Sequence, residues 1–335
     1  MANWLSKIFS KDEPYEIDPN DPHKETRFME KVVSEAFAEQ RRSRRWGIFF
    51  KGLTFAYLFF GIGIFFLSSR AIQGPSKAVD HVALVRLTGT IAKGEEASGA
   101  RINKALRNAF ENENSVGVML LANSGGGSPV QSDYMYSQIL KLRAEYPEKK
   151  IVTVIEDVCA SGCYYVASAS ETIYGNTNSL VGSIGVIGAG FGFTQAMEKL
   201  GIERRLYTSG QDKAFLDPFS PRVERQEQFW ESVLSRVHDN FKEAVKQGRG
   251  ERLTLTDELT GGFIWDGGQA KELGLIDELG DPREVAITVL GSEDLVDYTI
   301  KDSPLQSFMK GLGASIGKGI ASAVVAAGNA PPELR

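Results

Sequence analysis

Residues 158–165 read Val158-Cys159-Ala160-Ser161-Gly162-Cys163-Tyr164-Tyr165, and at this point a strand is predicted to give way to a helix. The preceding run, Ile151–Ile155, is β-branched throughout, as in a strand buried on both faces, and residues 164–169 can continue as a helix. Ser161 would then lie at a helix N-terminus, where the unpaired N–H of Gly162 could stabilise the oxyanion formed when the hydroxyl attacks a carbonyl carbon. We therefore predict that Ser161 is a nucleophile, although a serine before a helix can also serve only as its N-cap.

Strands and helices alternate on both sides of this junction. The sequence predicts strands at residues 81–91, 116–122, 151–155, near 173 and 204–208, and helices at residues 98–112, 130–146, 161–170 and 222–247. This alternation is typical of βα units around a mostly parallel sheet, so we predict an α/β fold.

Composition excludes several classes of protein. With 335 residues and 42% hydrophobic content, the chain can bury a substantial core. The net charge of -5 and the lack of a long basic face argue against nucleic acid as the main partner. Two cysteines exclude a disulfide scaffold, and the three histidines are too scattered to supply a metal site. We expect neither a metal nor a cofactor.

One segment is long and apolar enough to cross a bilayer. Residues 46–67 form an apolar run in which the single charge, Lys51, can snorkel to the interface. A buried helix of a soluble protein is a weaker interpretation, because the run is apolar on all sides. Arg41, Arg42, Arg44 and Arg45 precede it, so the positive-inside rule places the N-terminus in the cytoplasm and the residues after Arg70 outside it. Since the run begins only after 45 residues, we interpret it as an uncleaved anchor rather than a signal peptide.

A nucleophilic serine needs a base, because its hydroxyl reacts poorly at neutral pH. The histidines are poorly placed: His23 precedes the anchor, His81 opens the first strand and His238 falls inside a long helix. A lysine can serve instead if it is neutral, and lowering its pKa by about 3 units costs roughly 4 kcal/mol, which burial can impose.

Three further segments could complete such a site. Residues 123–128, Asn-Ser-Gly-Gly-Gly-Ser, follow a buried strand, so backbone N–H groups there can approach a ligand closely. A flexible loop or a phosphate cradle would explain this segment too, although it lacks the Gly-Lys of a P-loop. Residues 179–188 are glycine-rich and apolar, and residues 207–213 end in Lys213; ordinary turns would explain both.

Together these segments resemble the short membrane-anchored form of the signal peptide peptidase A family, serine peptidases with a Ser-Lys dyad and a ClpP/crotonase-like fold. The resemblance covers residues 80–290. The family's Asn-Ser-Pro-Gly-Gly, Ala-Ser-Gly-Gly-Tyr, Gly-Ser-Ile-Gly-Val and Ser-Gly-x-x-Lys motifs correspond to residues 123–127, 160–164, 182–186 and 209–213. Its trailing Trp-x-Gly-x-x-Ala…Gly-Leu-Val-Asp pattern corresponds to Trp265, Gly267, Ala270, Gly274, Leu275, Ile276 and Asp277.

The resemblance implies a role for each matching residue. Ser161 would be the nucleophile, and Lys213 the general base that later protonates the leaving amine. Ser183 would orient the lysine amine, while the N–H groups of Gly126 and Gly162 would form the oxyanion hole, with the peptide lying beside the glycine loop as an added strand. The resemblance also implies a homo-oligomer in which neighbouring protomers contribute the serine and the lysine.

The chain departs from the family pattern near the predicted nucleophile. Gly125 replaces a proline, which predicts a looser loop. Cys163 replaces a glycine, and Cys159 stands where small residues are usual. Because a disulfide between cysteines four positions apart across a tight turn would be strained, we expect two buried thiols.

We therefore expect a membrane-anchored serine endopeptidase that degrades remnant signal peptides or other membrane-associated peptides. It would sit in a bacterial-type inner membrane with its catalytic domain in the periplasm. The expected organisation is a cytoplasmic segment, a transmembrane anchor, a linker, a peptidase domain and an amphipathic tail, at residues 1–45, 46–69, 70–79, 80–290 and 291–335. Two alternatives are a noncatalytic membrane scaffold, against which Ser161, Lys213 and Ser183 argue, and a crotonase-type acyl-CoA enzyme, which an extracytoplasmic location disfavours.

Overall fold

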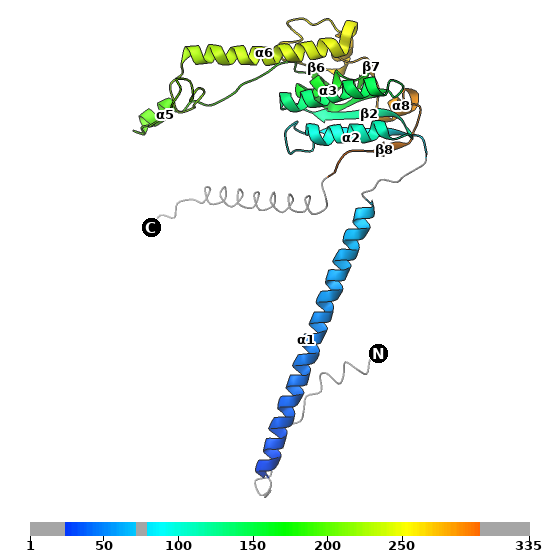
Figure 1. Cartoon of the computed structure of the whole chain (residues 1–335), viewed down its shortest axis with the longest axis vertical. Coiled ribbons are helices and arrows are strands. Elements are labelled where there is room, and N and C mark those ends of the chain that lie inside the picture. The colour runs from blue at the N-terminus through cyan, green and yellow to red at the C-terminus, as the bar shows by residue number, and fades with distance from the viewer. Residues whose placement is uncertain (1–23, 72–78, 302–335) are drawn as a thin grey trace, which may run out of the picture. The chain divides into compact units, whose positions relative to one another are not determined.

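The computed structural model describes residues 24–71 and 79–301, and the chain divides into two compact units, residues 1–73 and 74–335. In the first unit a single helix, α1 (Lys24–Ala71), includes the predicted span at residues 46–67 (Figure 1). Within the described residues, Arg44–Ile64 is the one stretch long and apolar enough to cross a membrane, on length and composition alone. Residues 1–23 of the predicted cytoplasmic segment, residues 72–78 of the predicted linker and residues 302–335 of the predicted tail lie outside the described residues.

The second unit is built on a mostly parallel sheet, which confirms the predicted α/β fold. Six strands follow one another in the order β6-β5-β3-β2-β1-β8, while β4 pairs with β3 and with β7. Among the described strand pairs, only β5 and β6 run antiparallel. The strands are β1 His81–Thr88, β2 Ser115–Ser124, β3 Ile151–Ala160, β4 Thr172–Gly175, β5 Leu180–Gly182, β6 Ile264–Asp266, β7 Glu278–Leu279 and β8 Leu295–Asp297.

Strand β3 changes partner along its length. Residues 152–155 pair with β4, whereas residues 158–160 pair with β5. On its other side β3 pairs with β2, with a register irregularity just before Ser124. The carboxyl end of β3 therefore lies between the ends of β2 and β5, which are the strands that lead into the two glycine-rich segments.

Helices cover both faces of the sheet. Because neighbouring side chains of a strand point to opposite faces, Val85 and Leu120 belong to a large core with α2, α3 and α4, whereas Leu84 and Leu121 pack with α8. The β-branched run at the start of β3 is fully buried, as predicted. The helices of this unit are α2 Gly99–Glu111, α3 Pro129–Glu145, α4 Gly162–Ala167, α5 Thr194–Lys199, α6 Glu224–Arg249, the 3₁₀ helix η1 Gly250–Arg252, α7 Gly267–Glu272 and α8 Pro282–Thr288.

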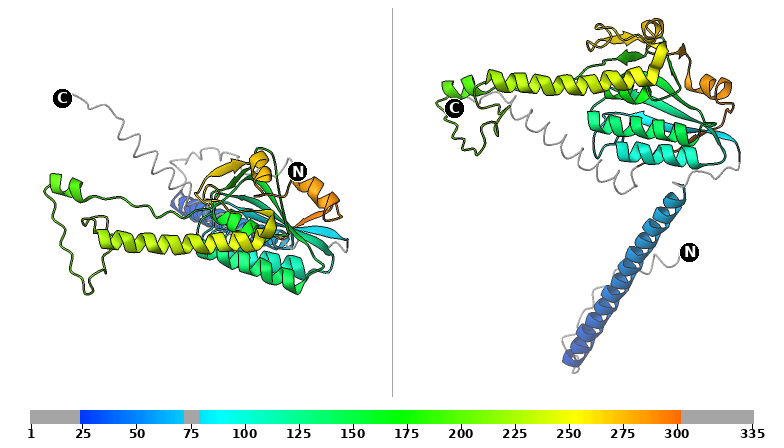
Figure 2. Two further views of the ribbon diagram at one scale, coloured as in Figure 1. Left: turned by 90° about the horizontal axis from the view of Figure 1, so that it is seen from above. Right: turned by 45° about the horizontal axis from the view of Figure 1, so that its top comes forward.

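Residues 187–240 extend away from the sheet, and we call them the arm (Figures 1 and 2). The buried residues of α6 all lie between Phe241 and Arg249. The part of α6 before Phe241 is about 25 Å long at 1.5 Å per residue. The arm exposes many large apolar side chains, including Ile187, Phe191, Leu200, Ile202, Tyr207, Leu216 and Phe229.

Several predicted boundaries differ from the structure. The expected strand at residues 204–208 is exposed and irregular, because no described strand lies beside it to complete its backbone hydrogen bonds. The strand predicted to reach Ile91 ends at Thr88, and the helix predicted to reach Ser170 ends at Ala167. The sheet also continues past residue 290, since β8 pairs in parallel with β1.

Candidate active site

Ser161 lies in a tight turn between β3 and α4. Its φ of 53° and ψ of -122° fall outside the backbone regions that L residues prefer. The Ser161 N–H donates to the Gly182 carbonyl at 2.8 Å, and the Ser161 carbonyl accepts the Tyr165 N–H at 3.0 Å. The Ser161 side chain makes no capping hydrogen bond to α4. The serine is therefore presented at the helix N-terminus but does not cap it, so the N-cap interpretation does not hold.

The glycine loop meets this turn. Gly126 has a φ of 92°, and a Cβ built on it would lie 2.6 Å from the Gly162 nitrogen and 2.8 Å from the Ser161 Cβ. A side chain at position 126 would therefore collide with the turn, so glycine is required there. Three residues predicted from two separate motifs thus lie together at the carboxyl end of the sheet.

The two predicted oxyanion donors differ in their present partners. Gly162 is the first residue of α4, so its N–H has no acceptor within the helix. The Gly126 N–H instead donates to Ser124 Oγ at 3.1 Å, and that hydroxyl donates to the Gly89 carbonyl. Ser124 thus orients the loop. Ser124 belongs to the motif at residues 123–127, but that motif alone assigns no role to its hydroxyl, so this contact was not predicted.

Ser183 follows the strand that neighbours β3. Ala160, the last residue of β3, pairs with Gly182, the last residue of β5. Because these strands are parallel, the residues that follow them, Ser161 and Ser183, come at the same edge of the sheet. Ser183 has a φ of 52°, and its N–H donates to the Phe263 carbonyl at 2.6 Å. The structure thus brings Ser183 near the turn, and its proposed role toward a lysine stays a prediction.

Lys213 lies in the arm, and within one chain it is not beside Ser161. Its side chain is exposed, and its neighbour Asp212 accepts hydrogen bonds from Arg225 and from Gln226 Nε2, the latter at 2.9 Å. These bonds lower the pKa of Asp212 and hold the segment at the start of α6. The Ser161 turn is instead close to the other end of α6, where the rings of Tyr165 and Phe241 are 5.1 Å apart. The arm part of α6 therefore separates the two predicted dyad residues within one chain.

Comparison with known proteins agrees with the motifs. The profile described as Peptidase family S49 matches residues 143–294. A putative protease of Synechocystis sp. is 30% identical over 226 residues, which cover 66% of this chain and 79% of that protein. The chain belongs to peptidase family S49. The putative signal peptide peptidase SppA of Enterococcus faecium is 31% identical to this S49 chain over 185 residues, covering 55% of the chain and 53% of that protein.

Another relative is similar to this S49 chain over only part of its own, longer sequence. The Na(+)/H(+) antiporter NhaA of Brucella abortus is 38% identical over 223 residues, covering 65% of this chain and 30% of the antiporter. The chain thus spans between about a third and about half of the length of the Brucella and Enterococcus relatives.

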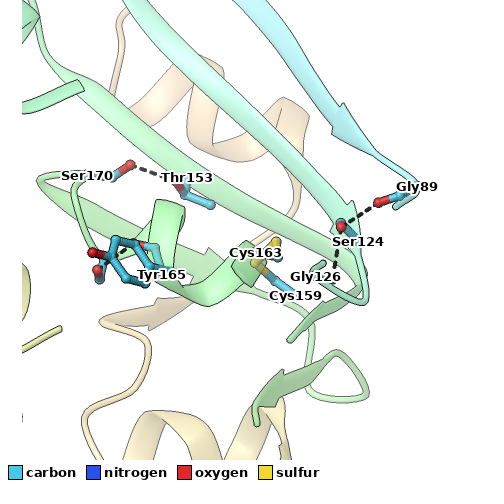
Figure 3. The surroundings of a disulfide bond; sticks show 9 residues. Gly89, Ser124, Gly126, Thr153, Cys159, Cys163, Tyr165 and Ser170 are labelled. Carbon is cyan, nitrogen blue, oxygen red and sulfur yellow. Dashed lines mark hydrogen bonds between the residues drawn. A yellow bond between two sulfur atoms is a disulfide. The ribbon is translucent and has the colours of Figure 1, made fainter. Parts of the chain in front are cut away.

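The two cysteines of this S49 chain form a disulfide, so the expectation of two thiols is wrong (Figure 3). The Cα atoms of Cys159 and Cys163 are 5.1 Å apart, a separation that a disulfide spans. The separation is this short because the turn at Ser161 folds the start of α4 back toward β3. Sequence spacing could not reveal this, because it predicts a tight turn but not the backbone angles of Ser161 within it.

The trailing motif supports the fold of this S49 chain. Its Asp277 accepts a hydrogen bond from Arg249 Nη1 at 2.7 Å, and the Arg249 side chain is fully buried. The Tyr164 hydroxyl, in α4, donates to the carbonyl of Leu275 in the motif at 2.8 Å. Burial raises the pKa of Tyr164, so the phenol stays protonated and keeps donating. The motif thus anchors the helix that follows Ser161.

Proposed function

We propose that this protein is a membrane-anchored serine endopeptidase in which Ser161 is the nucleophile and Lys213 of a neighbouring protomer is the general base. The observation that carries the proposal is the meeting of Ser161, Gly162 and Gly126 at one turn. A strained serine beside the first N–H of a helix, with a glycine loop against it, suits acyl transfer.

The chemistry follows from these positions. Ser161 Oγ would attack the carbonyl carbon of the substrate while the neutral Lys213 amine takes the hydroxyl proton. The oxyanion would accept the Gly162 N–H, and the Gly126 N–H would exchange Ser124 Oγ for this stronger acceptor. Protonated Lys213 would then donate its proton to the leaving amine. In the second half, Lys213 would take a proton from the water that attacks the acyl carbon and return it to Ser161 Oγ as the acid product leaves. Ser183 would accept a hydrogen bond from the amine and orient it.

Assembly into a homo-oligomer would supply the lysine. The arm carries Lys213 away from the serine of its own chain and exposes apolar side chains such as Ile187 and Tyr207, which are 91% and 89% exposed. Apolar surface of this kind is typical of a surface that another protein covers. We propose that the arm packs on a second copy and places Lys213 beside that copy's Ser161.

The substrate class is an extended peptide released at or near the membrane. Residues 125–127 follow a strand end and carry no side chains, so a peptide backbone could pair beside them. The apolar stretch of α1 would hold the enzyme where remnant signal peptides occur.

Two features support a catalytic domain outside the cytoplasm. Four arginines at residues 41–45 immediately precede the apolar run at residues 46–67, which favours a cytoplasmic N-terminus in a bacterial-type inner membrane. The disulfide adjoining Ser161 is of a kind that persists in oxidising compartments such as the periplasm.

Cleavage of a fluorogenic peptide by the full chain in detergent micelles tests the proposal. Ser161→Ala and Lys213→Ala should each lower kcat/KM by about 10³-fold or more, because each removes a group that reacts. Lys199→Ala is the matched control, since Lys199 is another exposed lysine of the arm, and it should retain wild-type activity. Equal cleavage by wild type, Ser161→Ala and Lys213→Ala would reject the dyad, and no cleavage by wild type would favour the noncatalytic scaffold.

A further inference from the structure

The disulfide encloses the proposed nucleophile. Cys159 is the penultimate residue of β3 and Cys163 is the second residue of α4, so the covalent bond between them (Figure 3) closes a short loop. Ser161 is the middle residue of that loop in the sequence. Both cysteine side chains are completely buried. A bond in this place ties the helix that follows the serine directly to the strand that precedes it.

The Ser161 backbone needs such a restraint. A residue with a side chain at φ 53° and ψ -122° persists only where its surroundings fix it. Ser161 makes two backbone hydrogen bonds, one to Gly182 and one to Tyr165. Neither bond fixes the position of the start of α4 relative to Cys159. The disulfide fixes it, because Cys163 belongs to α4.

The same bond also reaches the glycine loop. Cys159 pairs with Ser124 of β2 on one side and with Val181 of β5 on the other. Ser124 Oγ accepts the Gly126 N–H. Cys159 therefore lies between Ser124, which orients Gly126, and Val181, in the strand that leads to Ser183. The disulfide to Cys163 joins α4 to these three paired residues.

We propose that Cys159 and Cys163 are positioning residues, whose disulfide holds Ser161 Oγ and the Gly162 N–H in the geometry needed for attack on the substrate carbonyl. This inference rests on the proposed peptidase function and adds a requirement to it. Loss of the bond would let the turn relax toward an ordinary helix start, in which Ser161 becomes an N-cap. Substrate binding would persist, because the peptide pairs with the backbone of residues 125–127, which Ser124 Oγ still orients through the Gly126 N–H.

Peptide cleavage by the full chain in detergent provides the test. Cys159→Ala, Cys163→Ala and the double variant should each lower kcat by about tenfold or more, because a small displacement of a reacting group is costly, while KM stays within about twofold. The three effects should be equal, since each change removes the same bond.

Val152→Ala is the control for stability alone. Val152 is a fully buried residue of β3 that packs with α8, away from the turn, so truncating it weakens the same strand without touching the disulfide. Val152→Ala should keep wild-type kcat at a temperature where this variant and the cysteine variants are all folded. The rate of labelling by a fluorophosphonate, which reports Ser161 reactivity without a peptide, should fall with kcat in the cysteine variants only.

The outcomes are separable. If wild type cleaves peptide and the double cysteine variant cleaves it equally well, the positioning role is wrong while the peptidase function stands. If the two single effects add up to the double effect, the cysteines act as separate packing groups and the positioning role is again wrong. If wild type neither cleaves peptide nor reacts with the fluorophosphonate, the proposed function fails, and the inference fails with it.

Discussion

Gly126 packs directly against Gly162, so closely that a Cβ at position 126 would lie 2.6 Å from the Gly162 nitrogen. The two glycines come from the ends of different strands, and their contact places two candidate oxyanion donors beside Ser161. The neighbouring Gly125 has no atom within 4 Å of a built Cβ and carries no positive φ. One loop thus contains a position that must be glycine and a position that need not be.

Gly126→Ala is therefore expected to lower kcat by about 10²–10³-fold, comparable to the loss of one oxyanion donor. Gly125→Ala should stay within about twofold of wild type, because its side chain would meet open space. Steady-state cleavage of one peptide by both variants checks this. Equal losses at both positions would indicate that the loop tolerates no side chain anywhere, and would remove the argument for a donor at Gly126.

The buried Arg249–Asp277 pair should determine part of the stability. Arg249→Met leaves a largely buried carboxylate with less compensation, so we expect a loss of about 3–5 kcal/mol in the free energy of unfolding at pH 7. Arg107→Met, which removes a surface pair with Glu111, should cost about 0.5 kcal/mol or less. Denaturant unfolding of the full chain in detergent measures both free energies. Similar losses in the two variants would show that the buried pair stabilises the fold no more than the surface pair does.

The same pair predicts a dependence on pH. Burial alone would raise the pKa of Asp277, but hydrogen bonds from Arg249 and the Ile173 N–H, with the charges of Arg249 and Arg252, lower it below its ordinary value of 3.8. The stabilisation is then complete above the unfolded-state value and is lost as pH falls through the lower folded-state pKa. The destabilisation caused by Arg249→Met should shrink between pH 5 and about pH 3; a constant difference would contradict this.

The arm predicts an effect on assembly. Ile187→Asp or Phe191→Asp places a charge where the side chain is exposed in one chain, so the fold should survive while contact with a second copy is lost. Ile287→Asp, in α8, is the control for an exposed apolar residue outside the arm. Light scattering after gel filtration should show smaller particles for the arm variants only. If all three variants form particles of wild-type mass, the arm does not mediate assembly.

Much of the fold follows from local sequence patterns. The β-branched run of residues 151–155 predicts β3, and the helix expected at residues 130–146 corresponds to α3, because both patterns act through residues close together in the sequence. The expected strand at residues 204–208 fails for a physical reason: a strand needs a neighbour, and neighbours are set by tertiary structure.

The site was predictable only in part. Glycine motifs point to close backbone approach, and Ser161, Gly126 and Gly162 do meet. The disulfide could not be inferred, because it depends on the positive φ of Ser161, which the sequence does not specify. The distance between Lys213 and Ser161 depends on the direction of α6 and on which copy of the chain supplies the lysine, and local periodicity determines neither.

Mixed particles test the shared dyad most directly. Ser161→Ala and Lys213→Ala chains, each inactive alone, would be produced in the same cells with different tags and purified in detergent through both tags. If neighbouring protomers complete each site, random mixing leaves an intact serine beside an intact lysine in about one quarter of the sites, and peptide cleavage returns to about that fraction of wild type. Mixed particles as inactive as either parent would contradict a dyad shared between protomers.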